Sequence, residues 1–157
     1  MYYLFFLMIV FLGRDCGTVQ TSATTTATNG SSVDLNCTYT VGSGESVYSG
    51  LIVWQAKKSG TSDYENIATF SPPGLGGNFF TTTESAMNIK DRAELLNVTS
   101  IGSDTYRAVM RVLEVQCLDE KEYQCSVTFV STSTGPQTKT AVTSLTVQGK
   151  NQHHLHL

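Results

Sequence analysis

The segment Asp119-Glu120-Lys121-Glu122-Tyr123-Gln124-Cys125 (DEKEYQC, residues 119–125) decides the fold of this chain. It places Tyr123 two residues before a cysteine and Asp119 six residues before the same cysteine. Far upstream lies a second cysteine, Cys37, and the only tryptophan, Trp54, stands between the two. This order indicates stacked sheets, because an indole fills the space of about 10 Å that separates two packed sheets.

Most of the remaining chain consists of short segments in which apolar and polar residues alternate, separated by Gly, Ser, Asn and Asp. Between residues 33 and 39 every second side chain is apolar, which is typical of a strand with one buried face. No helical stripe stands out, and 41–50 is expected to be a Gly/Ser-rich loop. We predict an all-β, two-sheet antiparallel Greek-key sandwich. The expected strands are 33–39, 51–57, 65–71, 78–83, 93–98, 106–115, 122–130 and 140–147.

An ordered set of motifs from about residue 18 to residue 149 resembles the immunoglobulin superfamily V-set. The set comprises Cys37, Trp54, Arg92, Met110-x-Val112-x-x-Val115 and Asp119-x-x-x-Tyr123-x-Cys125. Within that superfamily the chain looks most similar to the first domains of nectin and poliovirus-receptor-type adhesion proteins. The residues that carry this likeness are Val53-Trp54-Gln55, Ile67-Ala68-Thr69-Phe70-Ser71-Pro72, Asp119-Glu120 and Val127-Thr128-Phe129.

The chain also departs from the superfamily pattern. Lys121 stands where the common motif has glycine, and 141–147 reads AVTSLTV in place of the Phe-Gly-x-Gly of antibody and T-cell-receptor domains. Only one domain is expected, whereas the adhesion receptors carry several domains and a membrane span.

The resemblance implies a specific core. It predicts a disulfide between Cys37 and Cys125 that Trp54 covers, a tyrosine corner at Tyr123, and a salt bridge between Arg92 and Asp119. Such a disulfide would stabilise the fold by on the order of 4 kcal/mol, because it constrains a long loop of the unfolded chain. The alternative is a different sandwich in which the cysteines pair otherwise.

The first residues have the pattern of a secretory signal peptide. Residues 4–13 (LFFLMIVFLG) are apolar, which is too short for the roughly 20 residues of a membrane span. We expect a signal peptide at 1–17 cut near Gly17 or Thr18, an immunoglobulin V-like domain at 18–149, and a disordered tail at 150–157. The predicted location is therefore secreted or at the extracellular cell surface, with no transmembrane span. No basic residue precedes the apolar run, and a short buried helix is the alternative interpretation.

Three Asn-x-Ser/Thr sequons agree with export and are the expected glycosylation sites: Asn29, Asn36 and Asn97. Alternation along the expected strands places all three on one sheet or at its edge. The other sheet then carries outward side chains without a sequon.

The cysteine at position 117 is predicted to be an unpaired thiol. Three interpretations of Cys117 stay open: a bridge to a retained Cys16, an intermolecular disulfide that links two copies, or a free thiol.

The composition speaks against catalysis and nucleic-acid binding. All three histidines, His153, His154 and His156, lie in the last five residues, so none within the fold can act as a base for a Ser or Cys nucleophile. The tail histidines could hold a metal ion weakly, but we expect no metal function, no cofactor and no enzymatic activity. The net charge of −3 and the scattered Lys and Arg residues exclude a basic stripe for nucleic acid.

We therefore expect a non-catalytic protein-recognition module for cell adhesion or immune-type receptor binding. The V-set resemblance implies binding through the sheet formed by strands G, F, C and C′. The expected partner is another immunoglobulin-type cell-surface protein, either homophilic or heterophilic. The alternative is a secreted recognition or decoy protein for a microbial or carbohydrate ligand. The outward candidates for partner binding are Val53, Gln55, Thr69, Gln124, Ser126 and Thr128, which Phe79 and Phe80 could extend unless one of them is buried.

Overall fold

The computed structural model describes residues 16–71, 77–100 and 104–149, except for the side chains of 48–51 and 97–100. The predicted tail with its three histidines, and all of the predicted signal peptide except Cys16 and Gly17, lie outside the described residues.

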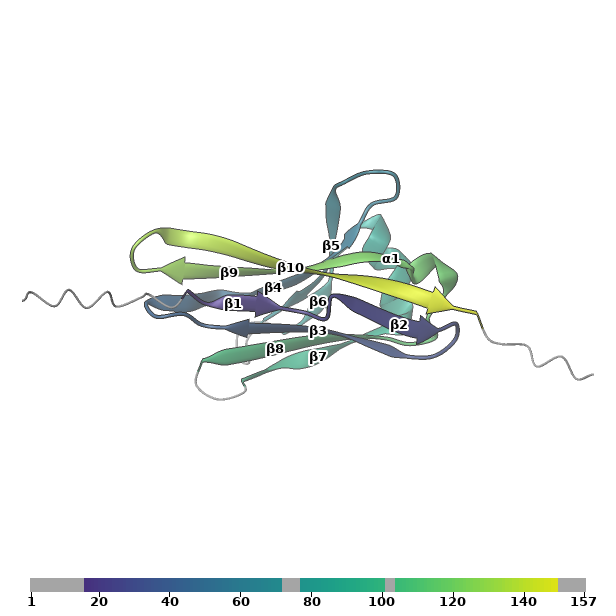
Figure 1. The fold of residues 1–157 in the computed structure, drawn as a ribbon, viewed down its shortest axis with the longest axis horizontal. Coiled ribbons are helices and arrows are strands. Elements are labelled where there is room, and N and C mark those ends of the chain that lie inside the picture. The colour runs from purple at the N-terminus through teal and green to yellow at the C-terminus, as the bar shows by residue number, and fades with distance from the viewer. Residues whose placement is uncertain (1–15, 72–76, 101–103, 150–157) are drawn as a thin grey trace, which may run out of the picture.

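Within these ranges ten strands form two stacked sheets (Figure 1). The four-stranded sheet has the order β1 (Thr18–Gln20), β3 (Val33–Thr40), β8 (Thr105–Val112) and β7 (Ala93–Ser100). The six-stranded sheet has the order β2 (Thr24–Thr28), β10 (Gly135–Gln148), β9 (Lys121–Ser131), β4 (Glu45–Lys57), β5 (Tyr64–Phe70) and β6 (Phe79–Phe80). Neighbouring strands are antiparallel apart from β2 and β10, which pair in parallel. The predicted all-β, V-type sandwich is confirmed.

The alternation of apolar residues explains which face of each sheet is buried. In β3, the side chains at 33, 35, 37 and 39 are buried, and in β9 those at 123, 125, 127 and 129 are buried. The residues between them are more exposed and point away from the other sheet. Each sheet therefore contributes one apolar face to a shared core.

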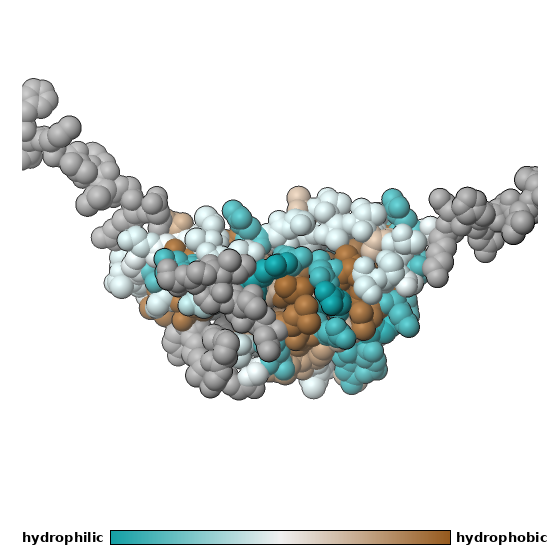
Figure 2. Space-filling model, turned by 90° about the horizontal axis from the view of Figure 1, so that it is seen from below, coloured by the Kyte–Doolittle hydropathy of each residue, from teal (hydrophilic) through white to brown (hydrophobic). Residues whose placement is uncertain are grey.

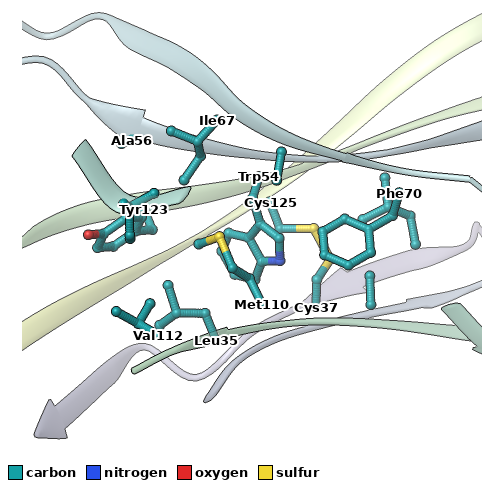
Figure 3. Packing of buried hydrophobic residues seen from close by; sticks show 14 of the residues in the cluster. Leu35, Cys37, Trp54, Ala56, Ile67, Phe70, Met110, Val112, Tyr123 and Cys125 are labelled. Carbon is teal, nitrogen blue, oxygen red and sulfur yellow. A yellow bond between two sulfur atoms is a disulfide. The ribbon is translucent and has the colours of Figure 1, made fainter. Parts of the chain in front are cut away.

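The centre of the core is a disulfide between Cys37 and Cys125, whose Cα atoms lie 6.1 Å apart. Figure 3 shows the Trp54 ring beside this bridge, between the two sheets, and Trp54 is fully buried. The other core side chains shown with it include Leu35, Met110 and Val112. The disulfide pairing and the place of the tryptophan agree with the pattern that the sequence predicted.

The first irregular region differs from the prediction, since 41–50 is not a loop throughout. β4 begins at Glu45, and its residues Glu45 and Val47 pair with Ser131 and Phe129 of β9 before the register shifts ahead of Ile52. The strand starts early because Val47 packs against the core and the Glu45 carboxylate accepts a hydrogen bond from the Gly42 N–H.

A short helix was also missed. The expected strand 78–83 is limited to Phe79–Phe80, and α1 (Glu84–Ile89) and the 3-10 turn η1 (Lys90–Arg92) follow. The Thr83 hydroxyl caps α1 by accepting from the Ala86 N–H, and Ala86 and Ile89 are buried. Six residues with two buried positions are too few to produce a recognisable helical period.

The strand expected at 106–115 ends at Val112. Glu114 adopts a φ of 48°, which turns the chain toward the 3-10 turn η2 (Cys117–Asp119), while Val115 remains buried. No helix of the described residues has the length and apolarity that a bilayer span needs.

Candidate interaction surface

A network of polar contacts holds the turn before β9 in place. Arg92 donates two hydrogen bonds to the Asp119 carboxylate at 2.8 and 2.9 Å, and Asp119 also accepts from the Gln116 N–H. The Tyr123 hydroxyl donates to the Asp119 carbonyl at 3.0 Å. Burial, followed by the charge of Asp119, raises the pKa of Tyr123, so its hydroxyl stays protonated and remains a donor. This network fixes the start of β9, the strand that carries the outward-facing Gln124, Ser126 and Thr128.

The strand register decides which side chains share the outer surface of the six-stranded sheet. Val53 is paired with Ser126 on one side and Thr69 on the other, and Thr69 is paired with Phe79. Directly paired residues point to the same face of a sheet. A second row joins Val142, Gln124, Gln55 and Asn66. We call this outer surface the six-stranded face; its members include Val53, Gln55, Asn66, Thr69, Phe79, Gln124, Ser126, Thr128, Thr138, Thr140 and Val142.

Five of the six predicted binding residues are partly exposed on this face. They are Val53, Gln55, Gln124, Ser126 and Thr128. The sixth, Thr69, points to the same side but is only 7% exposed, because its paired neighbours Val53 and Phe79 flank it. The prediction that Thr69 offers a contact to a partner is therefore corrected.

Two members of this face, Phe79 and Val142, are exposed apolar residues that lie towards its edges. Phe79 is 54% exposed, whereas Phe80 pairs with the buried Ala68 and packs against the core. Val142 is 38% exposed and is not among the residues that the sequence predicts for this face. In its segment, AVTSLTV, apolar residues occur at both odd and even positions, so the sequence alone does not show which side of the strand is buried. The burial of Thr143 and Leu145 shows that the odd positions face inward.

The centre of the six-stranded face is uncharged and, apart from Val53, polar. Among its described members Gln55 donates to Asn66 at 2.7 Å, and the hydroxyls of Thr128 and Thr138 lie 3.5 Å apart. Charged residues occur at one end of the face, at the end of β4 and the start of β9, where Lys57 and Glu122 form an ion pair. A partner could bury the central rows without removing a charged group from water.

The opposite surface, which we call the four-stranded face, is formed by the outward residues of β3, β8 and β7. Arg111 donates to the Asp34 carboxylate at 2.7 and 3.0 Å, and this hydrogen bonding holds the pKa of Asp34 below its usual value. Arg107 donates to the Asn36 side chain at 3.1 Å. Figure 2 shows the molecule from the side on which β3, β8 and β7 lie, with hydrophilic residues around hydrophobic ones. Asp34, Arg107 and Arg111 therefore already have polar partners within the protein.

The three predicted glycosylation sites lie off the strands of the six-stranded sheet. Asn36 is partly exposed on β3, and Asn29 is partly exposed in the turn between β2 and β3. Asn97 belongs to β7, and its side chain lies outside the described residues. None of the three sequons falls on a strand of the six-stranded sheet.

A cleft of about 740 Å³ lies at the Lys57 end of the sandwich, beside η2. Its lining includes Lys57, Gly60, Ile89, Arg92, Cys117 and Tyr123. The described residues contain no histidine and no group of three His, Cys, Asp or Glu side chains that could hold a metal ion.

The two free cysteines are exposed and far apart. Cys16 precedes Gly17, which contacts Glu45 at the start of β4, whereas Cys117 shares the cleft with Lys57 at the end of β4. A strand of this length spans about 40 Å, and cysteines more than about 7 Å apart at Cα cannot be bridged. The interpretation of a Cys16–Cys117 bridge within one chain is wrong.

Comparison with known proteins supports the fold. No protein-family model matches the chain, and no curated protein sequence matches it. A solved structure of murine CRIg is similar, with a TM-score of 0.63 and 16% identity over 84% of this chain and 98% of that one. A chain from a structure on the structural basis of T cell specificity and activation by the bacterial superantigen toxic shock syndrome toxin-1 has a TM-score of 0.60 and 16% identity, over 84% and 99% of the two chains. At this identity the similarity shows an immunoglobulin-like sandwich and does not distinguish a nectin-type subfamily.

Proposed function

We propose that this protein is an extracellular recognition domain that binds another protein through the six-stranded face. The observation that carries the proposal is the uncharged centre of this face, bordered by the exposed Phe79 and Val142. The centres of protein interfaces are depleted in charged residues and enriched in aromatic ones. None of the named members of the six-stranded face is charged, whereas the four-stranded face carries Asp34, Arg107 and Arg111.

The distribution of sequons supports the same choice of face. A glycan is bulky and hydrated, and it would block close contact around Asn36 on the four-stranded face and around Asn29 in the turn between β2 and β3. Charged pairs such as Arg111 with Asp34 would also have to be desolvated if that side were buried. Both considerations leave the six-stranded face as the surface where contact costs least.

The proposed partner is another immunoglobulin-type cell-surface protein, in adhesion or immune-type recognition. The V-set resemblance and the nectin-like residues around Trp54 support this partner class, since V-set adhesion domains commonly pair through the equivalent sheet. Export is supported by the disulfide, which forms in oxidising compartments, and by the apolar run at residues 4–13.

The proposal can be tested with fluorescent tetramers of the exported domain on a panel of cells. We expect binding that protease treatment of the cells removes and that Thr128→Arg weakens at least tenfold, because this substitution places an unpaired charge in the contact. Thr40→Arg is the matched control, since Thr40 is an exposed threonine of β3 in the other sheet, and it should leave binding unchanged.

Two results would overturn the proposal. Equal loss of binding from both substitutions would show that the six-stranded face has no special role. Binding that survives protease treatment but is abolished by glycosidases would identify a carbohydrate ligand in place of a protein partner.

A further inference from the structure

A buried carboxylate organises the end of the sandwich where β1 begins. The Glu45 side chain is only 7% exposed, and one of its oxygens, Oε2, accepts from the Tyr39 hydroxyl at 2.8 Å and from the Gly42 N–H at 3.0 Å. The other oxygen, Oε1, accepts from the Lys139 ammonium at 3.1 Å. Lys139 in turn lies 4.5 Å from the centre of the Phe129 ring. This cluster ties together β3, β4, β9 and β10.

Gly17 completes the cluster. Its N–H donates to Glu45 Oε2 at 3.1 Å, and its carbonyl accepts from Lys139 at 2.6 Å. A Cβ atom at this position would lie 2.3 Å from Glu45 Oε2 and 2.6 Å from the Thr40 carbonyl oxygen, so no side chain fits. Gly17 is buried, whereas the preceding Cys16 is exposed. The packed part of the described chain thus begins at Gly17.

We propose that maturation cuts the chain between Cys16 and Gly17, and that the new amino terminus of Gly17 forms an ion pair with Glu45. In this step a leader peptidase adds water across the peptide bond, so that Cys16 gains a carboxylate and Gly17 a free amine. An α-amino group has an ordinary pKa of about 7.7–8.0, so the amine carries a proton at neutral pH. The inference rests on the proposed export of the protein.

The contacts of the folded chain are complete only if the mature protein keeps Gly17 as its first residue. Leader peptidases prefer small residues at the last and the third-last position before the cut. The bond after Thr18 meets this pattern best, because it has Thr18 in the last position and Cys16 in the third-last. That cut, or one after Gly17, would remove Gly17 and leave Glu45 without one donor and Lys139 without its carbonyl acceptor. A cut before Gly17 keeps both contacts and replaces one amide N–H by an ammonium with three.

The charge of the new terminus fits its surroundings. Lys139 bonds to Oε1 of the carboxylate, while the Gly17 nitrogen faces Oε2, so the two cations use different oxygens. A charged donor strengthens a hydrogen bond to a carboxylate, and the effect is larger where water has little access. The cut would therefore complete the cluster rather than disturb it.

The first test is the intact mass and N-terminal sequence of the protein secreted by cells that express the full chain. The expected mature protein starts at Gly17. A secreted protein that starts at Thr18 or Val19, or anywhere else, overturns this inference and leaves the proposed binding function standing. A protein that stays inside the cell with Met1 in place overturns the proposed export itself, and this inference with it.

The second test measures the ion pair. We compare protein that starts at Gly17 with protein that carries one extra alanine before Gly17, each with Glu45 and with Glu45→Gln. With Glu45, the extra residue should increase the ratio of unfolded to folded protein by about tenfold, as loss of a charged hydrogen bond does. With Glu45→Gln it should increase that ratio less than twofold. Equal effects in the two backgrounds would contradict the ion pair.

Discussion

The ion pair between Arg92 and Asp119 allows a quantitative prediction. Asp119→Asn keeps the size of the side chain and an oxygen for the Gln116 N–H, but it removes the charge that faces Arg92. Removing one partner of a buried ion pair costs about 3–5 kcal/mol. Because the Arg92 side chain is 17% exposed and retains hydrogen bonds to the Glu114 and Asn88 carbonyls, we expect a smaller loss. The expected decrease in the free energy of unfolding is about 2–3 kcal/mol, or about 8 °C in Tm.

The assay is urea denaturation of the oxidised protein at neutral pH, followed by tryptophan fluorescence. The matched control is Asp34→Asn, which removes a carboxylate with similar hydrogen bonds to Arg111 but with both side chains more than a third exposed. The control should lose less than about 1 kcal/mol, because exposed ion pairs contribute little. If Asp119→Asn cost no more than Asp34→Asn, the reasoning that burial determines the contribution of this pair would be refuted.

Three further predictions concern the Glu45 cluster and the free thiol. Burial alone would raise the pKa of Glu45, but hydrogen bonds from Tyr39 and Lys139 outweigh burial and hold the pKa below its ordinary value. The stability that Glu45 contributes is therefore present above about pH 4.3, and it is lost as the pH falls through the lowered pKa. Thermal unfolding between pH 6 and pH 3 should therefore show a steeper loss of stability for the native chain than for Glu45→Gln, and parallel curves would contradict the lowered pKa. Gly17→Ala should reduce the free energy of unfolding by about 1–3 kcal/mol through overpacking, measured by urea denaturation, and an unchanged midpoint would show that the close approach to Glu45 is relieved without cost. If exposed Cys117 forms the predicted intermolecular disulfide, non-reducing electrophoresis of the secreted protein will show a dimer that Cys117→Ser abolishes, and a monomer band alone would exclude the dimer.

The sequence predicted the features of the fold that single residues or one short segment determine. Cys37, Trp54 and Cys125 each occupy a position that only one residue type fills well, so their order along the chain identifies the sandwich. The alternation in β3 and β9 likewise needs no knowledge of other segments, because burial of one face of a strand is visible as a period of two.

The features that were missed depend on residues far apart in the chain. Thr69 is buried because β6 places Phe79 beside it, and no local pattern shows this pairing. Glu45 starts β4 early because its carboxylate meets donors from Tyr39, Gly42 and Lys139, which belong to different elements. Such contacts become visible only after the chain has been folded.

The most direct test of the proposed binding surface introduces a glycan onto it. Thr138→Asn creates an Asn-Lys-Thr sequon with a single change, and Thr138 is exposed on β10 opposite Thr128. We predict that tetramers with a glycan at this position, with occupancy verified by mass, lose cell binding and recover it after enzymatic removal of the glycan. Undiminished binding by the fully glycosylated variant would contradict the assignment of the six-stranded face as the recognition surface.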